Sequence, residues 1–404
     1  MTMIDATMIA VLVIAFAILV SGPIRNNKGW SATVTPLASI IGSGFLVSVP
    51  LLASAIGIWA VAAVVGLTML AFLIGGAIRY NIEHGEPIFD TAEAGHPIKS
   101  IETLSHLVLI GAYFISVAYY LVLLSAFGLK LVGWSDPFLG KAVATVMIGG
   151  ICIVGATKGL AGVEKAEKFT VSANLAAIAA LIVSLVIFGL TLSEPYSWTA
   201  AAQEKHTFDW DTVRFLMGLL IIVQGFETTR FMGQMYSGKM RISAMRRAQI
   251  ISSLVYVGFF ILMIPLFPYF TSTADVAGFI DVIGRVTPWL PFVVTAGAIA
   301  SQFSASVADS IGASGLVSTT SRGHITPKHA YLVIGAVAVC VIWATDVVSI
   351  VTLASRAFAL FYALQCVVAV LVARHNQDRR KEVWFGGLAA IAFGIAVLGI
   401  PASG

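Results

Sequence analysis

Apolar runs of about 20 residues recur along the whole length of this 404-residue chain. A helix needs about 20 apolar residues to cross a bilayer, and inside lipid only helices and closed barrels satisfy their backbone polar groups. Composition agrees, because 58% of the residues are hydrophobic and only 11% are charged, whereas soluble domains carry about 25% charged residues. The sequence therefore predicts an all-α polytopic membrane protein.

We count twelve such segments and predict one transmembrane helix for each. Their spans are 5–22, 32–54, 58–79, 103–129, 139–157, 169–192, 212–237, 248–270, 287–318, 330–346, 348–373 and 383–400. No basic residue precedes the first segment, which therefore predicts a retained helix, with cleavage of a signal peptide near Ser21 as the alternative.

The Lys and Arg residues of the loops predict the orientation. When alternate loops are assigned to one side, beginning with 23–31, that side holds 17 of them and the other side holds five. The positive-inside rule places the richer side in the cytoplasm. We therefore expect a multi-pass protein of the plasma (inner) membrane with both termini extracellular or periplasmic. The charge is spread over short loops, which gives no sign of a nucleic-acid partner. The expected partners are the lipid bilayer and a small molecule, and the oligomeric state is not indicated.

Two of the apolar segments contain glycine and polar residues where a leucine-rich helix would be more stable. They read SIIGSGFLVSVP over 39–50 and IIVQGFETTR over 221–230. Each interior glycine costs about 0.5–1 kcal/mol relative to alanine. The two segments are the second and the seventh of the twelve, and this odd offset of five means that they cross the membrane in opposite directions. This pattern predicts an inverted repeat with one broken helix in each half, where exposed backbone groups bind substrate and ions. Close helix packing is the alternative use of the glycines.

Three runs resemble one known family. The run IIGSGFLVSVPLLASAIG is similar to the first core helix of the amino acid–polyamine–organocation (APC) superfamily, and VQGFETTRF resembles the Gly-Phe-Glu motif of its sixth core helix. The run ASGLVSTTSRGHITPKH is similar to its eighth helix and the following loop. The resemblance covers about residues 32–400 and implies a LeuT-type fold with five-plus-five inverted repeats. It divides the chain into an extra N-terminal helix (1–31), a first repeat (32–192), a second repeat (212–373) and a C-terminal accessory helix (383–404).

The same resemblance implies a substrate site. In the family, backbone amides of an unwound first core helix hold the substrate carboxylate, which a helix N-terminus also favours physically. Carried over to this chain, these positions are Ile41, Gly42, Ser43 and Gly44, and the opposite wall is Val223, Gln224, Gly225 and Phe226. On the third core helix, Tyr113, Tyr119 and Tyr120 are placed to line the cavity, with packing or interfacial tyrosines as the alternative for each.

The resemblance implies a secondary active transporter for a small amino acid or a related small organic solute. Members with large charged substrates often have an aromatic gate one turn before the Gly-Phe-Glu motif, and Ile221 stands there instead. We therefore expect a smaller or more apolar substrate. A substrate exchanger is a variant of this function, and a channel is a less favoured alternative. Motifs of intramembrane proteases and other membrane enzymes are absent from the sequence, so we expect no enzyme.

The coupling ion is predicted from the fifth and eighth core helices. The apolar run 169–192 carries no charged residue, so it lacks the lysine that replaces sodium in some family members. The eighth helix is rich in oxygen ligands, and Ser306 and Asp309 lie three residues apart on one helical face. We expect sodium, held by carbonyls near Ser39 and Gly42, by the Ser306 hydroxyl and by the Asp309 carboxylate. A proton on Asp309 or Glu227 is the alternative, and no further cofactor is expected.

Besides Asp309, three charged residues fall inside apolar segments, where a lone charge costs at least a few kcal/mol. They are Glu227, Arg230 and Arg356. The resemblance gives Glu227 a structural role, tying the broken helix to its neighbours. Arg230 lies one turn further along and is a candidate partner for it. Arg356 needs either a carboxylate or backbone carbonyls as its partner.

Overall fold

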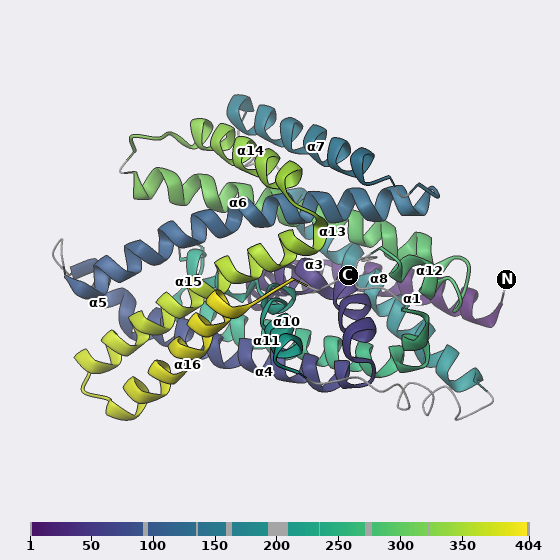
Figure 1. Cartoon of the computed structure of the whole chain (residues 1–404), viewed down its shortest axis with the longest axis horizontal. Helices are drawn as coiled ribbons and strands as arrows, with labels where there is room; N and C mark the ends of the chain where they lie inside the picture. The colour runs from purple at the N-terminus through teal and green to yellow at the C-terminus, as the bar shows by residue number, and fades with distance from the viewer. Residues whose placement is uncertain are drawn as a thin grey trace.

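A computed structural model of the chain describes residues 2–91, 96–134, 136–158, 164–192, 209–233, 235–270, 277–321 and 323–401. Over this part the chain is built of helices and contains no strand, which confirms the all-α fold (Figure 1). The α-helices are α1 (Met3–Val20), α2 (Gly22–Arg25), α3 (Lys28–Ile56), α4 (Trp59–Tyr80), α5 (Glu86–Thr91), α6 (Pro97–Leu131), α7 (Pro137–Lys158), α8 (Glu164–Thr191), α10 (Trp210–Met217), α11 (Gly238–Met263), α12 (Phe279–Ile283), α13 (Leu290–Thr320), α14 (Pro327–Ala344), α15 (Val347–His375) and α16 (Arg379–Leu398). Shorter π or 3₁₀ segments are η1 (Asn81–Gly85), η3 (Leu220–Val223), η4 (Phe226–Phe231) and η5 (Ile264–Tyr269).

Within the described residues, 11 helices are long and apolar enough to cross a membrane. In chain order they correspond to eleven of the twelve predicted segments, and the protein is a multi-pass membrane protein. The remaining segment, 212–237, is divided into α10, η3 and η4, so the predicted break in this helix is confirmed. The order of the long helices suits two five-helix repeats flanked by one helix at each end. Their inverted symmetry stays a prediction.

The core of the molecule forms around α3 and α6. Figure 1 shows α6 crossing the middle of the molecule, where it packs against α13 and α15, with α7 and α14 beyond it. The middle of α6 reads SVAYYLVLLS and is apolar on nearly every side, as expected of a helix surrounded by protein. The extra helix α1 is peripheral: it packs along α8, and Thr287 donates a hydrogen bond to Asp5 near its start.

Cysteine labelling tests the predicted orientation. Ser237 is exposed just before α11, and its hydroxyl makes no capping hydrogen bond there, so a cysteine at this site is accessible without loss of structure. In a Cys340→Ala background, which removes the exposed native thiol, we expect Ser237→Cys to react with an impermeant maleimide only after cell lysis. Val132→Cys, exposed at the opposite end of α6 from Pro97, is the control that should react in intact cells. Labelling of Ser237→Cys in intact cells would reverse the orientation.

Candidate functional site

The break in the seventh segment is centred on Gly225. Here the chain leaves η3, is extended at Gln224, and turns at Gly225 with φ +115° before η4 begins. Residues other than glycine rarely adopt such a φ. A Cβ at Gly225 would also lie 2.5 Å from the Ser39 hydroxyl oxygen of α3. Both the turn and the close approach to α3 therefore require glycine.

Side chains from neighbouring helices satisfy the backbone groups that the break releases. The Tyr256 hydroxyl of α11 donates a hydrogen bond to the Ile222 carbonyl and lies 3.2 Å from the Ile40 carbonyl of α3. The Ser355 hydroxyl of α15 accepts a hydrogen bond from the Ile221 amide at 3.2 Å. An unsatisfied backbone group costs several kcal/mol in a membrane. These polar side chains therefore allow irregular backbone at this depth.

Glu227 completes this set. Its Oε2 accepts hydrogen bonds from the Gly225 amide at 2.9 Å and from the Tyr362 hydroxyl of α15 at 2.7 Å. Phe226 stacks on the Tyr362 ring, with centroids 5.0 Å apart. The other carboxylate oxygen, Oε1, is buried and has no hydrogen-bond partner within the described residues. Glu227 thus holds the turn closed and keeps one acceptor available.

The first core helix differs from the prediction. Helix α3 is continuous from Lys28 to Ile56, so the expected unwinding at 41–44 is wrong for this structure. The four amides of Ile41, Gly42, Ser43 and Gly44 belong to this helix and are not exposed to a carboxylate; the Ser43 side chain lies outside the described part. The glycines instead allow close packing, because a Cβ at Gly44 would lie 2.6 Å from the Ile222 Cα, and one at Gly42 2.7 Å from the Ser301 hydroxyl.

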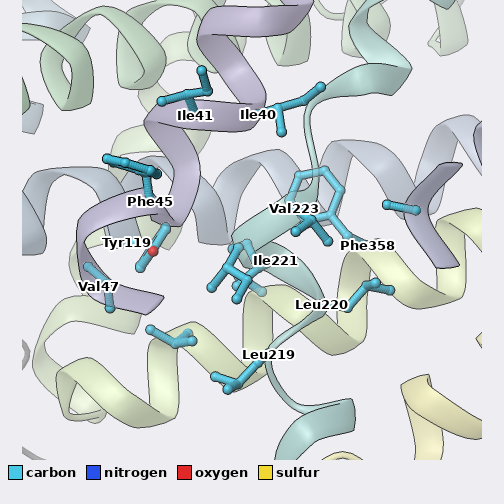
Figure 2. Packing of buried hydrophobic residues seen from close by; sticks show 14 of the residues in the cluster. Ile40, Ile41, Phe45, Val47, Tyr119, Leu219, Leu220, Ile221, Val223 and Phe358 are labelled. Carbon is cyan, nitrogen blue, oxygen red and sulfur yellow. The ribbon is translucent and has the colours of Figure 1, made fainter. Parts of the chain in front are cut away.

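Some of the predicted substrate residues nevertheless meet around the break. Figure 2 shows η3 lying between α3 and α15, with Ile41 and Phe45 on the α3 side. Val223 and Phe226 are buried in this contact. The Gln224 side-chain amide donates a hydrogen bond to the Tyr120 hydroxyl of α6 at 2.8 Å. The broken segment therefore forms one continuous site together with α3 and α6.

The tyrosines of α6 contact different neighbours. The Tyr113 ring packs edge-on against Phe358 of α15, with centroids 6.0 Å apart. The Tyr119 ring lies 5.3 Å from that of Tyr120, and its buried hydroxyl has no hydrogen-bond partner within the described residues. Tyr120 contacts the broken segment directly and therefore agrees best with the prediction that these tyrosines line the substrate site.

The predicted sodium ligands each have a different partner. The Gly42 carbonyl accepts a hydrogen bond from the Gln302 side chain at 2.8 Å, and Ser39 lies beside Gly225. The Ser306 hydroxyl donates to a carbonyl of its own helix at 2.8 Å. Asp309 accepts a hydrogen bond from Ser116 of α6. The structure thus brings Gly42 to α13, at a point nearer the start of α13 than Ser306 and Asp309.

At that point lies a cavity of about 20 Å³ between α3, α8 and α13. Its polar lining is Gly42, Asn174, Ser301 and Gln302. The Gln302 Oε1 is buried and has no hydrogen-bond partner within the described residues. The cavity has room for about one water-sized species. None of Asn174, Ser301 and Gln302 was among the predicted ligands, although Asn174 is the one amide side chain in the 169–192 run.

Arg230 has partners other than the one predicted. Its guanidinium lies 2.6 Å from Glu102 of α6 and 3.0 Å from Glu86 of α5, and Arg241 of α11 lies 2.6 Å from the same Glu86. The pairing with Glu227 is therefore wrong. Arg230 points away from the break, toward acidic residues on other helices. The four charges join η4 to three separate helices.

Arg356 uses a backbone carbonyl, which was one of the two predicted options. Its Nε donates a hydrogen bond to the Ala396 carbonyl of α16 at 2.7 Å. The residue is exposed on α15, away from Arg230 and its partners. It therefore joins the accessory helix α16 to the core and takes no part in the site around the break.

Comparison with known proteins agrees with this architecture. A family model described as an APC superfamily transporter matches residues 22–399. An uncharacterized protein of Aquifex aeolicus is 34% identical over 403 residues, covering 99% of this chain and 98% of its own length. The match extends over the broken segment, α3, α6, α13 and the charged residues around Arg230. The chain belongs to the APC superfamily of transporters.

Proposed function

We propose that the protein is an ion-coupled secondary transporter of a small amino acid or a related small organic solute. The observation that carries the proposal is the break at Gln224 and Gly225, which lies against Ser39 and Gly44 of α3. Buried polar groups converge there in an otherwise apolar interior. Discontinuous helices with such groups are where transporters of this kind bind their substrates.

The walls of the site favour a small substrate. Ile221, Val223 and Phe226 are all buried apolar residues in contact with the break. A carboxylate reaches the amides of 41–44 only if α3 unwinds there, and Gly42 and Gly44 make such unwinding less costly than other residues would.

Sodium is the coupling ion that we favour. The small cavity between α3 and α13 offers the oxygens of Ser301, Asn174 and Gln302, and hard cations take oxygen ligands. An ion there would join the two helices. If sodium raises substrate affinity, linkage requires the substrate to raise sodium affinity by the same factor, typically about 5- to 150-fold. The rival is a proton carried by Asp309 or Glu227.

We expect Ser301→Ala to weaken the dependence of substrate affinity on sodium, because it removes an oxygen from the cavity. Ser306→Ala is the matched control, since the Ser306 hydroxyl is already bonded to its own helix. The measurement is substrate affinity in sodium and in choline buffer, at two pH values. If the Ser306 variant alone loses sodium dependence, the ion lies deeper along α13. If sodium changes nothing, acid stimulates uptake and Asp309→Asn abolishes that stimulation, a proton is the coupling ion.

Uptake into proteoliposomes tests the function itself. We expect saturable accumulation that requires an imposed ion gradient, with candidate solutes taken from a thermal-shift screen of amino acids, amines and nucleobases. A ligand that binds the native state raises the apparent stability of the protein. Non-saturating flux would indicate a channel and contradict the proposal. Chemical conversion of a solute without accumulation would indicate an enzyme.

A further inference from the structure

A cleft of about 480 Å³ lies where α2 and α3 meet the connection between η4 and α11. One wall consists of Arg25, Lys28 and Ser31, and the other of Met235, Tyr236 and Met240. Its volume lies within the range of about 300–1,000 Å³ that is typical of small-molecule sites. The cleft is separate from the break and from the cavity at Gly42.

The cleft carries positive charge that no carboxylate neutralises within the described residues. Arg25 and Lys28 are exposed and make no ion pair there. Arg247 of α11 adds a third cation beside them, because a Cβ on Gly29 would lie 3.1 Å from its guanidinium. Arg241, in the same helix but buried, is by contrast paired with Glu86.

The N-terminus of α3 adds to the positive charge of the cleft. Its cap, Asn27, accepts a hydrogen bond from the Trp30 amide, and the first turn contains no acidic residue. The amides of Lys28 and Gly29 therefore face outward with the positive end of the helix dipole, beside the cations described above. Such a helix end with adjacent cations is suited to bind a phosphate group.

The position along the chain indicates where the phosphate comes from. Residues 21–27 join two candidate membrane spans, Met3–Val20 and Lys28–Ile56, so they lie at headgroup depth when both spans cross the bilayer. The predicted orientation puts them at the cytoplasmic leaflet, whose anionic lipids attract basic juxtamembrane residues. Met235 and Met240 of the facing wall offer apolar contacts for the part of a lipid that adjoins its phosphate.

We propose that this cleft binds the phosphate headgroup of an anionic phospholipid through Arg25, Lys28 and the N-terminus of α3. The bound lipid bridges the start of α3 and the chain that follows the broken helix. If the protein is a transporter, the lipid resists separation of these two elements and regulates opening on this side. That regulatory role rests on the proposed function, whereas the binding itself does not.

The test uses the purified full-length chain in nanodiscs of phosphatidylcholine with a minor fraction of spin-labelled phosphatidylglycerol. Electron paramagnetic resonance measures the fraction of labelled lipid immobilised by the protein. We expect Arg25→Gln/Lys28→Gln to weaken the association about fivefold for each charge removed. Arg379→Gln/Arg380→Gln, at exposed positions in the first turn of α16, is the matched control and should keep the wild-type value.

Each other outcome overturns the proposal. Equal loss in both double variants would mean a general surface attraction without a built site, and no loss in either would mean that the cleft binds no anionic lipid. Displacement of the labelled lipid by millimolar inorganic phosphate would mean a soluble anion site instead. Arg25→Lys/Lys28→Arg, which retains both charges, should bind as the wild type does; its failure would mean that the glutamine variants act through misfolding.

Discussion

Replacing Arg230 by methionine is expected to lower the free energy of unfolding by about 3–5 kcal/mol, the cost of leaving a buried charge without its partner. Glu102 is 6% exposed and lies 2.6 Å from the Arg230 guanidinium. Methionine fills the same space but leaves that carboxylate without its guanidinium partner. The measurement is unfolding in mixed micelles, with Arg356→Met as the matched control. Arg356 is exposed and donates one hydrogen bond to a backbone carbonyl, so its loss should cost only about 0.5–1.5 kcal/mol.

The double variant Arg230→Met/Glu102→Gln separates the ion pair from general packing. Neutralising Glu102 removes the uncompensated charge, so the double variant should be more stable than Arg230→Met alone. Similar losses for Arg230→Met and Arg356→Met would show that the Arg230 pairs contribute little. Addition of the two single effects without coupling would contradict a direct Arg230–Glu102 interaction.

The partners of Arg230 illustrate what the sequence could not predict. Its glutamates lie 144 and 128 positions away in the chain, at Glu86 and Glu102, and neither stands out in a hydropathy pattern. The nearest carboxylate in sequence, Glu227, was a natural candidate. In a 3₁₀ segment, however, the side chain of Glu227 folds back to the Gly225 amide. The three-residue spacing of Glu227 and Arg230 predicted that the two side chains are neighbours on one helix. The irregular backbone directs them to different partners.

The fold itself was largely predictable because a bilayer restricts the choices. Lengths of about 20 apolar residues define spanning helices whatever their tertiary contacts. The break at 224–225 was also predictable, since Gln, Gly and Glu stand together in an apolar run. The glycines of α3 were not sufficient to predict whether this helix is broken, because glycine weakens a helix but also allows a neighbouring helix to approach closely. Tyr256 and Tyr362 form hydrogen bonds with groups at the break. Nothing in the sequence distinguishes these two tyrosines from aromatic residues that only pack.

Gly44→Ala is expected to impair both stability and transport, because a Cβ at this position would lie 2.6 Å from the backbone of Ile222. The methyl group must displace the broken segment or α3, and such overpacking costs about 1–3 kcal/mol. Better helix propensity offsets up to about 1 kcal/mol of this. Because the displaced backbone belongs to the break itself, the uptake rate should fall in proteoliposomes even when the folded yield is matched to that of the wild type.

Gly42→Ala, two residues earlier on the same helix, is the matched control for Gly44→Ala. Its Cβ would meet only the Ser301 hydroxyl, at 2.7 Å, and a hydroxyl can rotate away where a backbone cannot. We expect Gly42→Ala to be close to neutral in stability, because the gain in helix propensity offsets a small local adjustment. Its expected defect is confined to sodium dependence, since Gly42 borders the cavity on α13. If both variants transport at the wild-type rate, transport does not depend on the close approach of α3 to the broken segment, and the proposed site is contradicted. If Gly42→Ala is the more damaging of the two in stability, the close contact between α3 and the broken segment is not what holds the site together.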